Sequence, residues 1–221
     1  MLVGGDEFRE ECTSMDTYLL ERINKATPRV AIIPTAAANQ QPQKAAANGI
    51  TYFNTLGANA ESIMILSRED AENNSYFENI TEMDLIYFTG GDPKHLFTSL
   101  NQTMFMEYVV SSVSNGTFLV GSSAGAMVLG SKMRYGNWIP GMGFVSNTAV
   151  MPHHEKSVPE NIFLEIHTEL STGTKVIGID SATGVFFHEG EVKILAKGKA
   201  VIYSDDAVSY TQLTQPTILH V

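Results

Sequence analysis

The sequence predicts an α/β protein: a three-layer sandwich with a mostly parallel central sheet and an antiparallel hairpin near the C-terminus. Short apolar runs alternate with stretches of helical length through the first half of the chain, which is the pattern of β-α-β units. Such runs form a parallel sheet that helices cover on both faces. Because 43% of the 221 residues are hydrophobic, the chain can bury one substantial core, and we assign residues 1–221 to a single domain.

The first elements follow one another as strand and helix. Residues 29–34 (RVAIIP) form a β-rich run that a proline ends, and the Ala- and Gln-rich residues 41–56 form a helix that Gly57 closes. Residues 61–66 (ESIMIL) are the next predicted strand. Ser67 is suited to cap the N-terminus of the acidic helical segment that comes after it.

The next strand leads into a glycine turn. Residues 83–92 (MDLIYFTGGD) are predicted as a strand that ends in Gly-Gly, and Pro93 suits the first turn of a helix through Leu100. After another helical segment, residues 117–121 (TFLVG) form the fourth strand. Four strands separated by helices complete the parallel part of the sheet.

The second half of the chain is less regular. Residues 143–151 (GFVSNTAVM) and 175–180 (KVIGID) are predicted strands, with a helix over about 159–170 between them. Residues 184–203 alternate around Glu189-Gly190, which is a hairpin signal. We therefore expect antiparallel strands to close one edge of the sheet.

The composition argues against several classes of partner. The formal net charge is −10, from 14 Lys and Arg against 24 Asp and Glu, which disfavours nucleic acid and anionic membranes. No apolar run approaches the roughly 20 residues of a membrane-spanning helix, and the first residues lack the features of a secretory signal. Cys12 is the only cysteine, which fits a reducing compartment. We expect a cytoplasmic protein.

Residues 121–125 (GSSAG) fit the pattern G-x-S-x-G, with Ser123 in the middle. In a nucleophile elbow, a strand enters a helix through a sharp turn whose small neighbours let the central residue adopt a strained conformation. The serine hydroxyl is then exposed at the C-terminal edge of the sheet, and the N-terminus of the helix favours a developing oxyanion. The alternative is a Gly- and Ser-rich loop without chemistry.

A serine nucleophile needs a base, which is usually histidine. Of the six histidines, His153 and His154 end a β-rich run and can point toward the same sheet edge as Ser123. We predict His153 as the base, with a solvated loop as the alternative. A metal site made of His153, His154 and Glu155 is less well supported, because adjacent residues of an extended chain face opposite ways. We predict no metal and no cofactor.

The acid that orients the histidine is harder to assign. No Asp or Glu occurs between Ser123 and His153. Asp180 is the best candidate, because it ends a predicted strand at the same sheet edge. A turn-forming role for Asp180 is equally well supported, and Glu155 is the second candidate for the acid.

The Gly-Gly turn after the third strand is a candidate oxyanion hole. Glycines at a strand end let backbone N–H groups approach a substrate carbonyl closely. We assign this role to Gly91 and to the N–H of Ala124, and we assign Gly90, Asp92 and His154 to substrate binding. The alternative is a plain tight turn before the next helix.

Taken in order, several segments resemble the dipeptidase E / cyanophycinase family of serine peptidases. They are residues 121–126 (GSSAGA), 86–100 (IYFTGGDPKHLFTSL), 151–155 (MPHHE), 176–183 (VIGIDSAT), 29–38 (RVAIIPTAAA) and 2–8 (LVGGDEF). The resemblance implies a class I glutamine amidotransferase-like (flavodoxin-like) fold. It also implies Ser123 as nucleophile, His153 as base and the Gly90-Gly91 turn in the oxyanion hole.

The chain departs from the family pattern around the acid. Members usually have Phe or Tyr after the catalytic histidine, where this chain has His154, and Ser181 replaces the Glu of the family's GIDExTA segment. Dipeptidase E members carry an Asp near residues 137–143, where this chain has no acid. Residues 138–143 (WIPGMG) instead resemble a cyanophycinase-like subgroup. The identity of the acid stays open.

The resemblance implies an intracellular serine-type peptidase, a hydrolase with a small peptide as its substrate. Aspartyl dipeptides and cyanophycin-type β-aspartyl-arginine are the candidate substrates, cleaved through an acyl-enzyme. An acidic substrate needs a local basic group such as Arg134 or Lys156. A homodimer is a further family-level expectation.

Two other functions stay open. An α/β-hydrolase esterase would use the same elbow, with Asp180 as acid and then His188 or His220 as base. A binding or regulatory protein would keep the scaffold without catalysis, which the missing acid favours. A glutamine amidotransferase has the least support, because Cys12 is not in an elbow.

Overall fold

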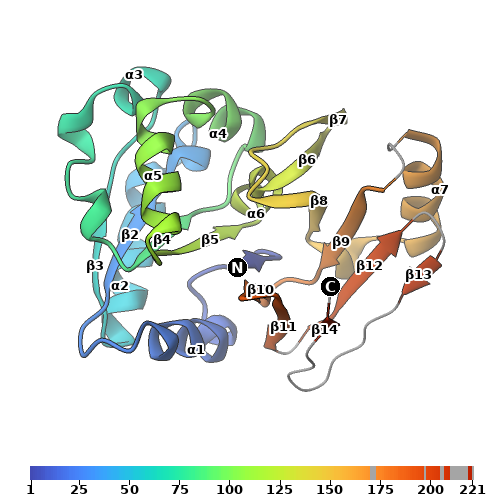
Figure 1. The fold of residues 1–221 in the computed structure, drawn as a ribbon, viewed down its shortest axis with the longest axis horizontal. Helices are drawn as coiled ribbons and strands as arrows, with labels where there is room; N and C mark the ends of the chain where they lie inside the picture. The colour runs from blue at the N-terminus through green and yellow to red at the C-terminus, as the bar shows by residue number, and fades with distance from the viewer. Residues whose placement is uncertain (170–172, 197, 205–206, 210–218, 221) are drawn as a thin grey trace.

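The computed structural model describes residues 1–169, 173–196, 198–204, 207–209 and 219–220, and within them the strands form two sheets (Figure 1). The first sheet has the order β14 (Leu219–His220), β11 (Glu191–Ala196), β10 (Thr183–His188), β1 (Leu2–Val3), β5 (Phe118–Ser122), β4 (Leu85–Phe88), β2 (Arg29–Ile33) and β3 (Asn59–Ser62). The second has the order β13 (Ala207–Ser209), β12 (Ala200–Ser204), β9 (Lys175–Ile179), β8 (Val145–Pro152), β6 (Gly130–Tyr135) and β7 (Asn137–Pro140).

Helices and short 3₁₀ turns connect these strands. The α-helices are α1 (Thr13–Ile23), α2 (Pro42–Thr55), α3 (Arg68–Ala71), α4 (Pro93–Leu100), α5 (Met104–Ser114), α6 (Ala124–Leu129) and α7 (Pro159–Glu169). The 3₁₀ turns are η1 (Glu10–Cys12), η2 (Thr35–Ala37), η3 (Asn74–Tyr76), η4 (Ile80–Glu82) and η5 (His154–Lys156). None of the described helices combines the length and the apolar character needed to cross a membrane.

The first sheet is mostly parallel, as predicted. Strands β1, β5, β4, β2 and β3 pair in parallel, so their C-terminal ends meet at one edge. The hairpin around Glu189-Gly190 is confirmed, because β10 pairs antiparallel with both β1 and β11. Strand β1 lies in the middle of the sheet although it has only two residues, and this length is too short to show a hydrophobic period.

Helices cover both faces of the first sheet (Figure 1). On one face, α1 and α2 bury Leu19 and Phe53 against Val30 and Ile32 of β2. On the other, α4 and α5 pack against the alternate residues of β2, among them Ile33. Because both faces of β2 are buried, the run is continuously apolar rather than alternating. The predicted three-layer arrangement is therefore present.

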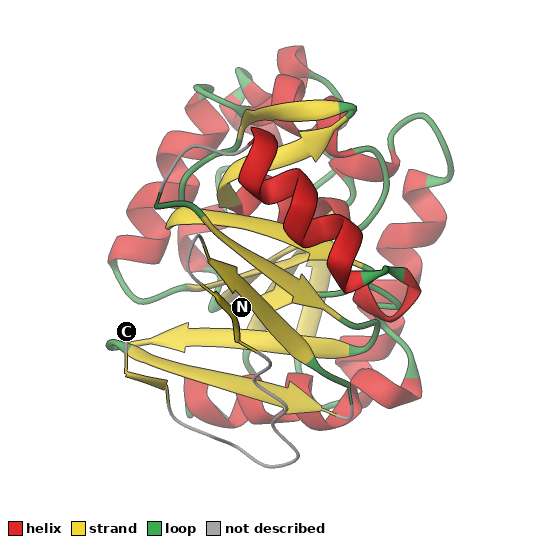
Figure 2. Cartoon of the chain, turned by 90° about the vertical axis from the view of Figure 1, so that its right-hand side faces the viewer, coloured by secondary structure: helices red, strands yellow, loops and turns green. Residues whose placement is uncertain are grey.

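The second sheet is a feature that the sequence pattern does not predict. Strand β8 pairs in parallel with β6 and β9, and β12 pairs antiparallel with β9. Helix α7 lies across the outer face of this sheet (Figure 2), where Ile162 and Ile166 pack against Val176. The predicted helix over 159–170 corresponds to α7, and residue 170 lies outside the described residues.

The segment predicted as a strand over 61–66 differs from the structure. Strand β3 ends at Ser62. Ile63 still donates its N–H to the Ile32 carbonyl of β2, but it and Ile65 belong to the buried connection that follows the strand. The end of the strand and the connection after it are both buried and apolar, so hydrophobicity alone cannot show where the strand ends. Ser67 does cap α3, because its side chain accepts from the Asp70 N–H in a capping box.

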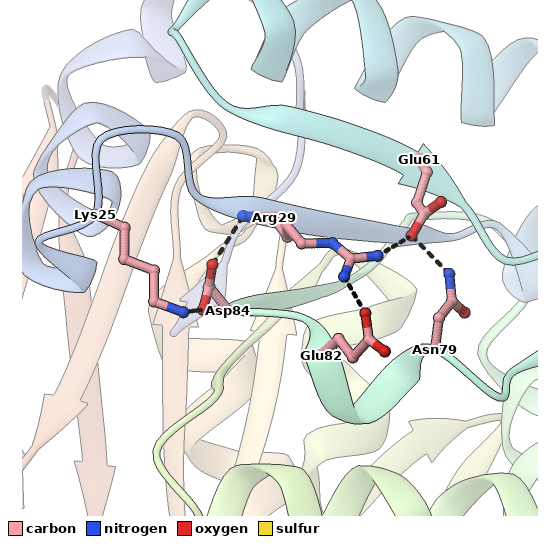
Figure 3. A network of polar contacts seen from close by, with 6 residues as sticks. All are labelled: Lys25, Arg29, Glu61, Asn79, Glu82 and Asp84. Atoms are coloured by element: carbon pink, nitrogen blue, oxygen red, sulfur yellow. Dashed lines mark hydrogen bonds and ion pairs between the residues drawn. The ribbon is translucent and has the colours of Figure 1, made fainter.

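A network of charged groups lies where β2 and β4 begin (Figure 3). Asp84 accepts a hydrogen bond from the Arg29 N–H at 2.9 Å and pairs with Lys25 at 2.6 Å. The Arg29 guanidinium contacts Glu61 and Glu82. These contacts join the N-terminal ends of neighbouring strands, at the sheet edge opposite the one where β5 ends.

Asp16 of α1 is fully buried, and we predict that it makes stability depend on pH. Its Oδ2 accepts from the Tyr52 hydroxyl at 2.9 Å, and its Oδ1 has no partner among the described residues. Burial raises the pKa of Asp16 from the usual 3.8 to about 7, against the lowering effect of the Tyr52 hydrogen bond. The folded state therefore holds a proton that the unfolded state releases above pH 3.8.

The stability that this proton contributes is complete below the unfolded pKa and is lost as pH rises to the folded pKa. Over this range the loss amounts to about 4 kcal/mol, at about 1.4 kcal/mol per pH unit. Asp16→Asn should be more stable than the wild type at pH 8 and should lose less stability between pH 5 and pH 8. Urea unfolding at both pH values measures this, with the exposed Glu107→Gln as control. Parallel pH dependence in wild type and Asp16→Asn would contradict the prediction.

Candidate active site

Ser123 lies at a sharp turn between β5 and α6. Its φ of 50° and ψ of −110° are strained for a residue with a side chain, as the central position of a nucleophile elbow requires. The Ser123 N–H donates to the Val3 carbonyl at 2.9 Å, which ties the turn to β1. A Cβ atom on Gly121 would lie 2.4 Å from the carbonyl carbon of Gly125, so only glycine fits beneath the turn.

His153 follows β8 of the second sheet and reaches Ser123. The distance between Ser123 Oγ and His153 Nε2 is 2.9 Å, which fits a nucleophile and its general base. The ring lies against the backbone of Gly5, where a Cβ atom would be 2.0 Å from His153 Cε1. Ser123 and His153, which the sequence analysis predicts as nucleophile and base, are therefore in contact.

A hydroxyl, rather than a carboxylate, faces the other nitrogen of His153. The distance from His153 Nδ1 to Ser181 Oγ is 3.2 Å. Ser181 donates its hydroxyl to Glu155 Oε1 at 2.8 Å and its N–H to Glu155 Oε2 at 2.9 Å. Burial raises the pKa of Glu155, but the hydrogen bonds from Ser181 outweigh burial and hold this pKa below its usual value.

The structure does not bring Asp180, the first candidate for the acid, to His153. Asp180 Oδ2 accepts from the Lys199 N–H at 2.9 Å, and Oδ1 lies 3.9 Å from Nδ1 of His154. Because Asp180 and Ser181 are consecutive residues after β9, their side chains leave the backbone in different directions, and that of Ser181 faces His153.

The histidines of the esterase alternative are not brought to Ser123 either. His188 ends β10, which runs antiparallel to β1, so it lies at the opposite edge of the first sheet from Ser123. The side chain of His220 lies outside the described residues. No described histidine other than His153 contacts Ser123.

Two residues assigned to substrate binding have structural partners instead. His154 is buried, its Nε2 lies 2.6 Å from the Tyr203 hydroxyl, and its ring packs on Gly178. Burial lowers the pKa of His154 despite the nearby carboxylates. The Asp92 carboxylate accepts from two N–H groups in the first turn of α4 and so caps this helix. Neither side chain lines the cleft above Ser123.

The Gly-Gly turn after β4 lies beside the elbow. A Cβ atom on Gly90 would be 3.3 Å from that of Ser123, and the Gly90 N–H donates to Glu7 Oε1 at 2.7 Å. Gly91 has a φ of +145°, and a Cβ atom there would lie 2.1 Å from the Ala36 carbonyl oxygen. In the described part of the chain, the N–H groups of Gly91 and Ala124 donate to no other residue. Both stay available for an oxyanion.

Ser123 and His153 open onto a cleft of about 640 Å³. The loop after β1 forms one wall, and the start of α2 forms the other. Two cations line it: Arg9 lies 3.6 Å from Asp6, whereas Lys44 has no carboxylate within salt-bridge distance among the described residues.

Sequence reasoning missed these cations and favoured two others. Arg134 pairs with Glu165 at 2.5 Å, Lys156 lies beside Glu155, and neither lines the cleft. Arg9, in the loop after β1, directly follows the LVGGDEF segment (residues 2–8), which the sequence marks only by resemblance. Lys44 enters the cleft because α2 follows the C-terminal end of β2, and this proximity depends on the sheet order.

Glu7 in this loop was also missed. Its Oε1 accepts from Gly90, and its Oε2 accepts from the Ser122 hydroxyl at 2.8 Å. Glu7 therefore links the Gly-Gly turn to the elbow. Among the described residues, no group of three His, Cys, Asp or Glu side chains is arranged to hold a metal ion.

Comparison with known proteins gives consistent results. Residues 1–195 match the model of peptidase family S51. The chain is 25% identical to cyanophycinase of Synechococcus elongatus, over 96% of this chain and 69% of the relative. It is 24% identical to peptidase E of a Nostoc species, over 82% of this chain and 77% of the relative.

A solved structure agrees with the whole fold. The structure of a peptidase from an acI-B1 Actinobacterium superposes with a TM-score of 0.86 at 25% identity, covering 99% of this chain and 95% of that one. The family match includes every parallel strand of the first sheet and both residues of the Ser123–His153 contact. By this extent of similarity, the chain belongs to peptidase family S51 and is a serine peptidase.

Proposed function

We propose that this peptidase hydrolyses small peptides with Ser123 as nucleophile and His153 as general base. The observation that carries the proposal is the 2.9 Å contact between Ser123 Oγ and His153 Nε2 at a strained elbow that opens onto a cleft. The two residues follow strands of different sheets, so their proximity in the sequence does not explain the contact.

The reaction proceeds in two halves. His153 Nε2 takes the hydroxyl proton while Ser123 Oγ bonds to the substrate carbonyl carbon, and the oxyanion accepts from the N–H groups of Gly91 and Ala124. The C–N bond then breaks, and His153 gives its proton to the leaving amine. Water, activated by the same nitrogen, hydrolyses the acyl-enzyme. Each oxyanion donor is worth about 3 kcal/mol in the transition state.

The cleft supports a short substrate that carries a carboxylate. The cations Arg9 and Lys44 lie along it, and Lys44 has no carboxylate within salt-bridge distance among the described residues. A substrate carboxylate would pair with such a group. Together with relatives named cyanophycinase and peptidase E, this supports aspartyl dipeptides and β-aspartyl-arginine as the first substrates to assay.

Labelling with a fluorophosphonate, which reacts with activated serine hydroxyls, tests the proposal. We expect one equivalent to attach to the wild type at Ser123, because among the described residues only this hydroxyl both contacts His153 and lines the cleft. Ser123→Ala should take up no label, and the exposed Ser114→Ala should be labelled like the wild type. Intact-mass spectrometry with peptide mapping gives both readouts. Label that persists in Ser123→Ala, or a wild type that is neither labelled nor active on dipeptides, would refute the proposal and favour a binding protein.

A further inference from the structure

The hydrogen bonds behind His153 have only one consistent direction. A charged carboxylate can only accept, so the Ser181 hydroxyl donates its single proton to Glu155 Oε1, at 2.8 Å. Ser181 Oγ can then only accept on its other side, where His153 Nδ1 lies at 3.2 Å. The proton of neutral His153 therefore lies on Nδ1, and the lone pair of Nε2 faces Ser123.

Glu155 also determines where the Ser181 hydroxyl lies. Its second oxygen, Oε2, accepts from the Ser181 backbone N–H at 2.9 Å, so the carboxylate holds both polar groups of this residue. These hydrogen bonds keep Glu155 charged at neutral pH, because they lower its pKa in spite of burial. The orientation of the Ser181 hydroxyl thus depends on the fixed negative charge of Glu155. Without this partner the hydroxyl could rotate about its Cβ–Oγ bond and would not keep this orientation.

We propose that Glu155 is the acid of this site and acts on His153 through the hydroxyl of Ser181. The inference rests on the proposed function for its catalytic meaning. Ser181 and Glu155 are positioning residues in this scheme, since neither touches the substrate. They select the tautomer of His153 and stabilise the imidazolium that forms when Ser123 loses its proton.

We call the chain of hydrogen bonds from Glu155 through Ser181 to His153 the relay, and its proton balance is simple. When Nε2 takes the proton of Ser123, Nδ1 keeps its own, and the Ser181 hydroxyl stays protonated. The imidazolium charge is met by the oxygen of Ser181, whose dipole Glu155 orients. When Nε2 passes its proton to the leaving amine, the ring returns to the starting tautomer, so no proton moves along the relay.

Kinetics of four variants test the relay. Ser181→Ala should lower kcat for dipeptide hydrolysis by about 10²-fold to 10³-fold, with KM changed less than about threefold, because the wrong tautomer of His153 becomes populated. This loss is smaller than the roughly 10⁴-fold loss in kcat that follows removal of an acid in direct contact with the histidine. Ser181→Thr, which keeps the hydroxyl, should restore kcat to within about tenfold of the wild type. Glu155→Gln should move the acidic limb of the pH–rate profile to lower pH, because the charge that favours imidazolium is removed.

Asp180→Asn tests the competing acid. Its amide oxygen can still accept from the Lys199 N–H, so the fold should be kept. We expect kcat and the pH–rate profile to stay at wild-type values. A loss in Asp180→Asn that equals the loss in Ser181→Ala would overturn the relay, as would wild-type kcat in Ser181→Ala.

A readout that needs no turnover separates this inference from the proposed function. The ¹⁵N shifts of the His153 ring, assigned with His153→Gln, report which nitrogen carries the proton. We expect the Nδ1–H tautomer in the wild type and a mixture in Ser181→Ala. If these shifts are found but neither peptide cleavage nor labelling occurs, the relay stands and the peptidase proposal falls. An Nε2–H tautomer in the wild type overturns the relay even when the enzyme is active.

Discussion

Ser123→Ala is expected to abolish measurable peptide hydrolysis while leaving the fold intact. Loss of the nucleophile in a serine peptidase lowers kcat by up to about 10⁶-fold, because the oxyanion donors and substrate binding alone supply only the remaining acceleration. Among the described residues, the only hydrogen bond that this change removes is the one to His153, at 2.9 Å. The hydroxyl makes no helix-capping hydrogen bond, so α6 should form as before.

The measurement is release of free amine from an aspartyl dipeptide, followed for hours at high enzyme concentration. Circular dichroism and the thermal midpoint serve as controls for folding, and Ser114→Ala controls for loss of a serine elsewhere. Activity of Ser123→Ala within about tenfold of the wild type would exclude Ser123 as the nucleophile, given the size of the expected loss.

Gly5→Ala should also lower activity strongly, although Gly5 takes no part in the chemistry. The new methyl group would lie 2.0 Å from Cε1 and 2.6 Å from Nδ1 of His153, distances that no packing tolerates. The ring must move, and its contacts with Ser123 and Ser181 must lengthen. A displacement of about 1 Å at a catalytic group can cost about 10²-fold in rate, so we expect at least this loss in kcat.

A matched variant separates ring displacement from backbone strain. Gly5 has a φ of +125° and Gly57 a φ of +90°, but a Cβ atom on Gly57 would meet no atom within 4 Å. Both Gly57→Ala and Gly5→Ala should lower stability through strain, by about 1–2 kcal/mol. Only Gly5→Ala should lose kcat and react slowly with fluorophosphonate. Full kcat in folded Gly5→Ala would show that His153 does not act from this position.

The elbow could be predicted from sequence because its chemistry is local. The turn itself demands Gly121 and the serine two residues later, whereas Gly125 is needed because a Cβ atom there would lie 2.4 Å from the Phe88 carbonyl oxygen of β4. The strand that precedes the turn is apolar on both faces. His153 could be predicted because it follows a strand at the same sheet edge. In both cases a short stretch of chain carries the whole signal.

The rest of the site depends on contacts between distant segments. Residues 155 and 181 meet only because β8 and β9 are neighbours in the second sheet, a sheet with no separate signature in the sequence. A serine hydroxyl is not an acid, so the sequence gives no reason to link Ser181 to His153, and Asp180 beside it is the more obvious candidate. The loop after β1 enters the cleft because a two-residue strand lies in the middle of the first sheet.

The oxygen and nitrogen of the Ser123–His153 contact are carried by different sheets: Ser123 follows β5 in the first, and His153 follows β8 in the second. The value of kcat therefore depends on the position of one sheet relative to the other. A slide of one against the other by about 1 Å would part the reacting pair while every strand stayed hydrogen-bonded. Inactivation without unfolding is the expected result of a substitution that loosens the apolar cluster to which both sheets contribute, for example through Val185 of β10 and Ile177 of β9.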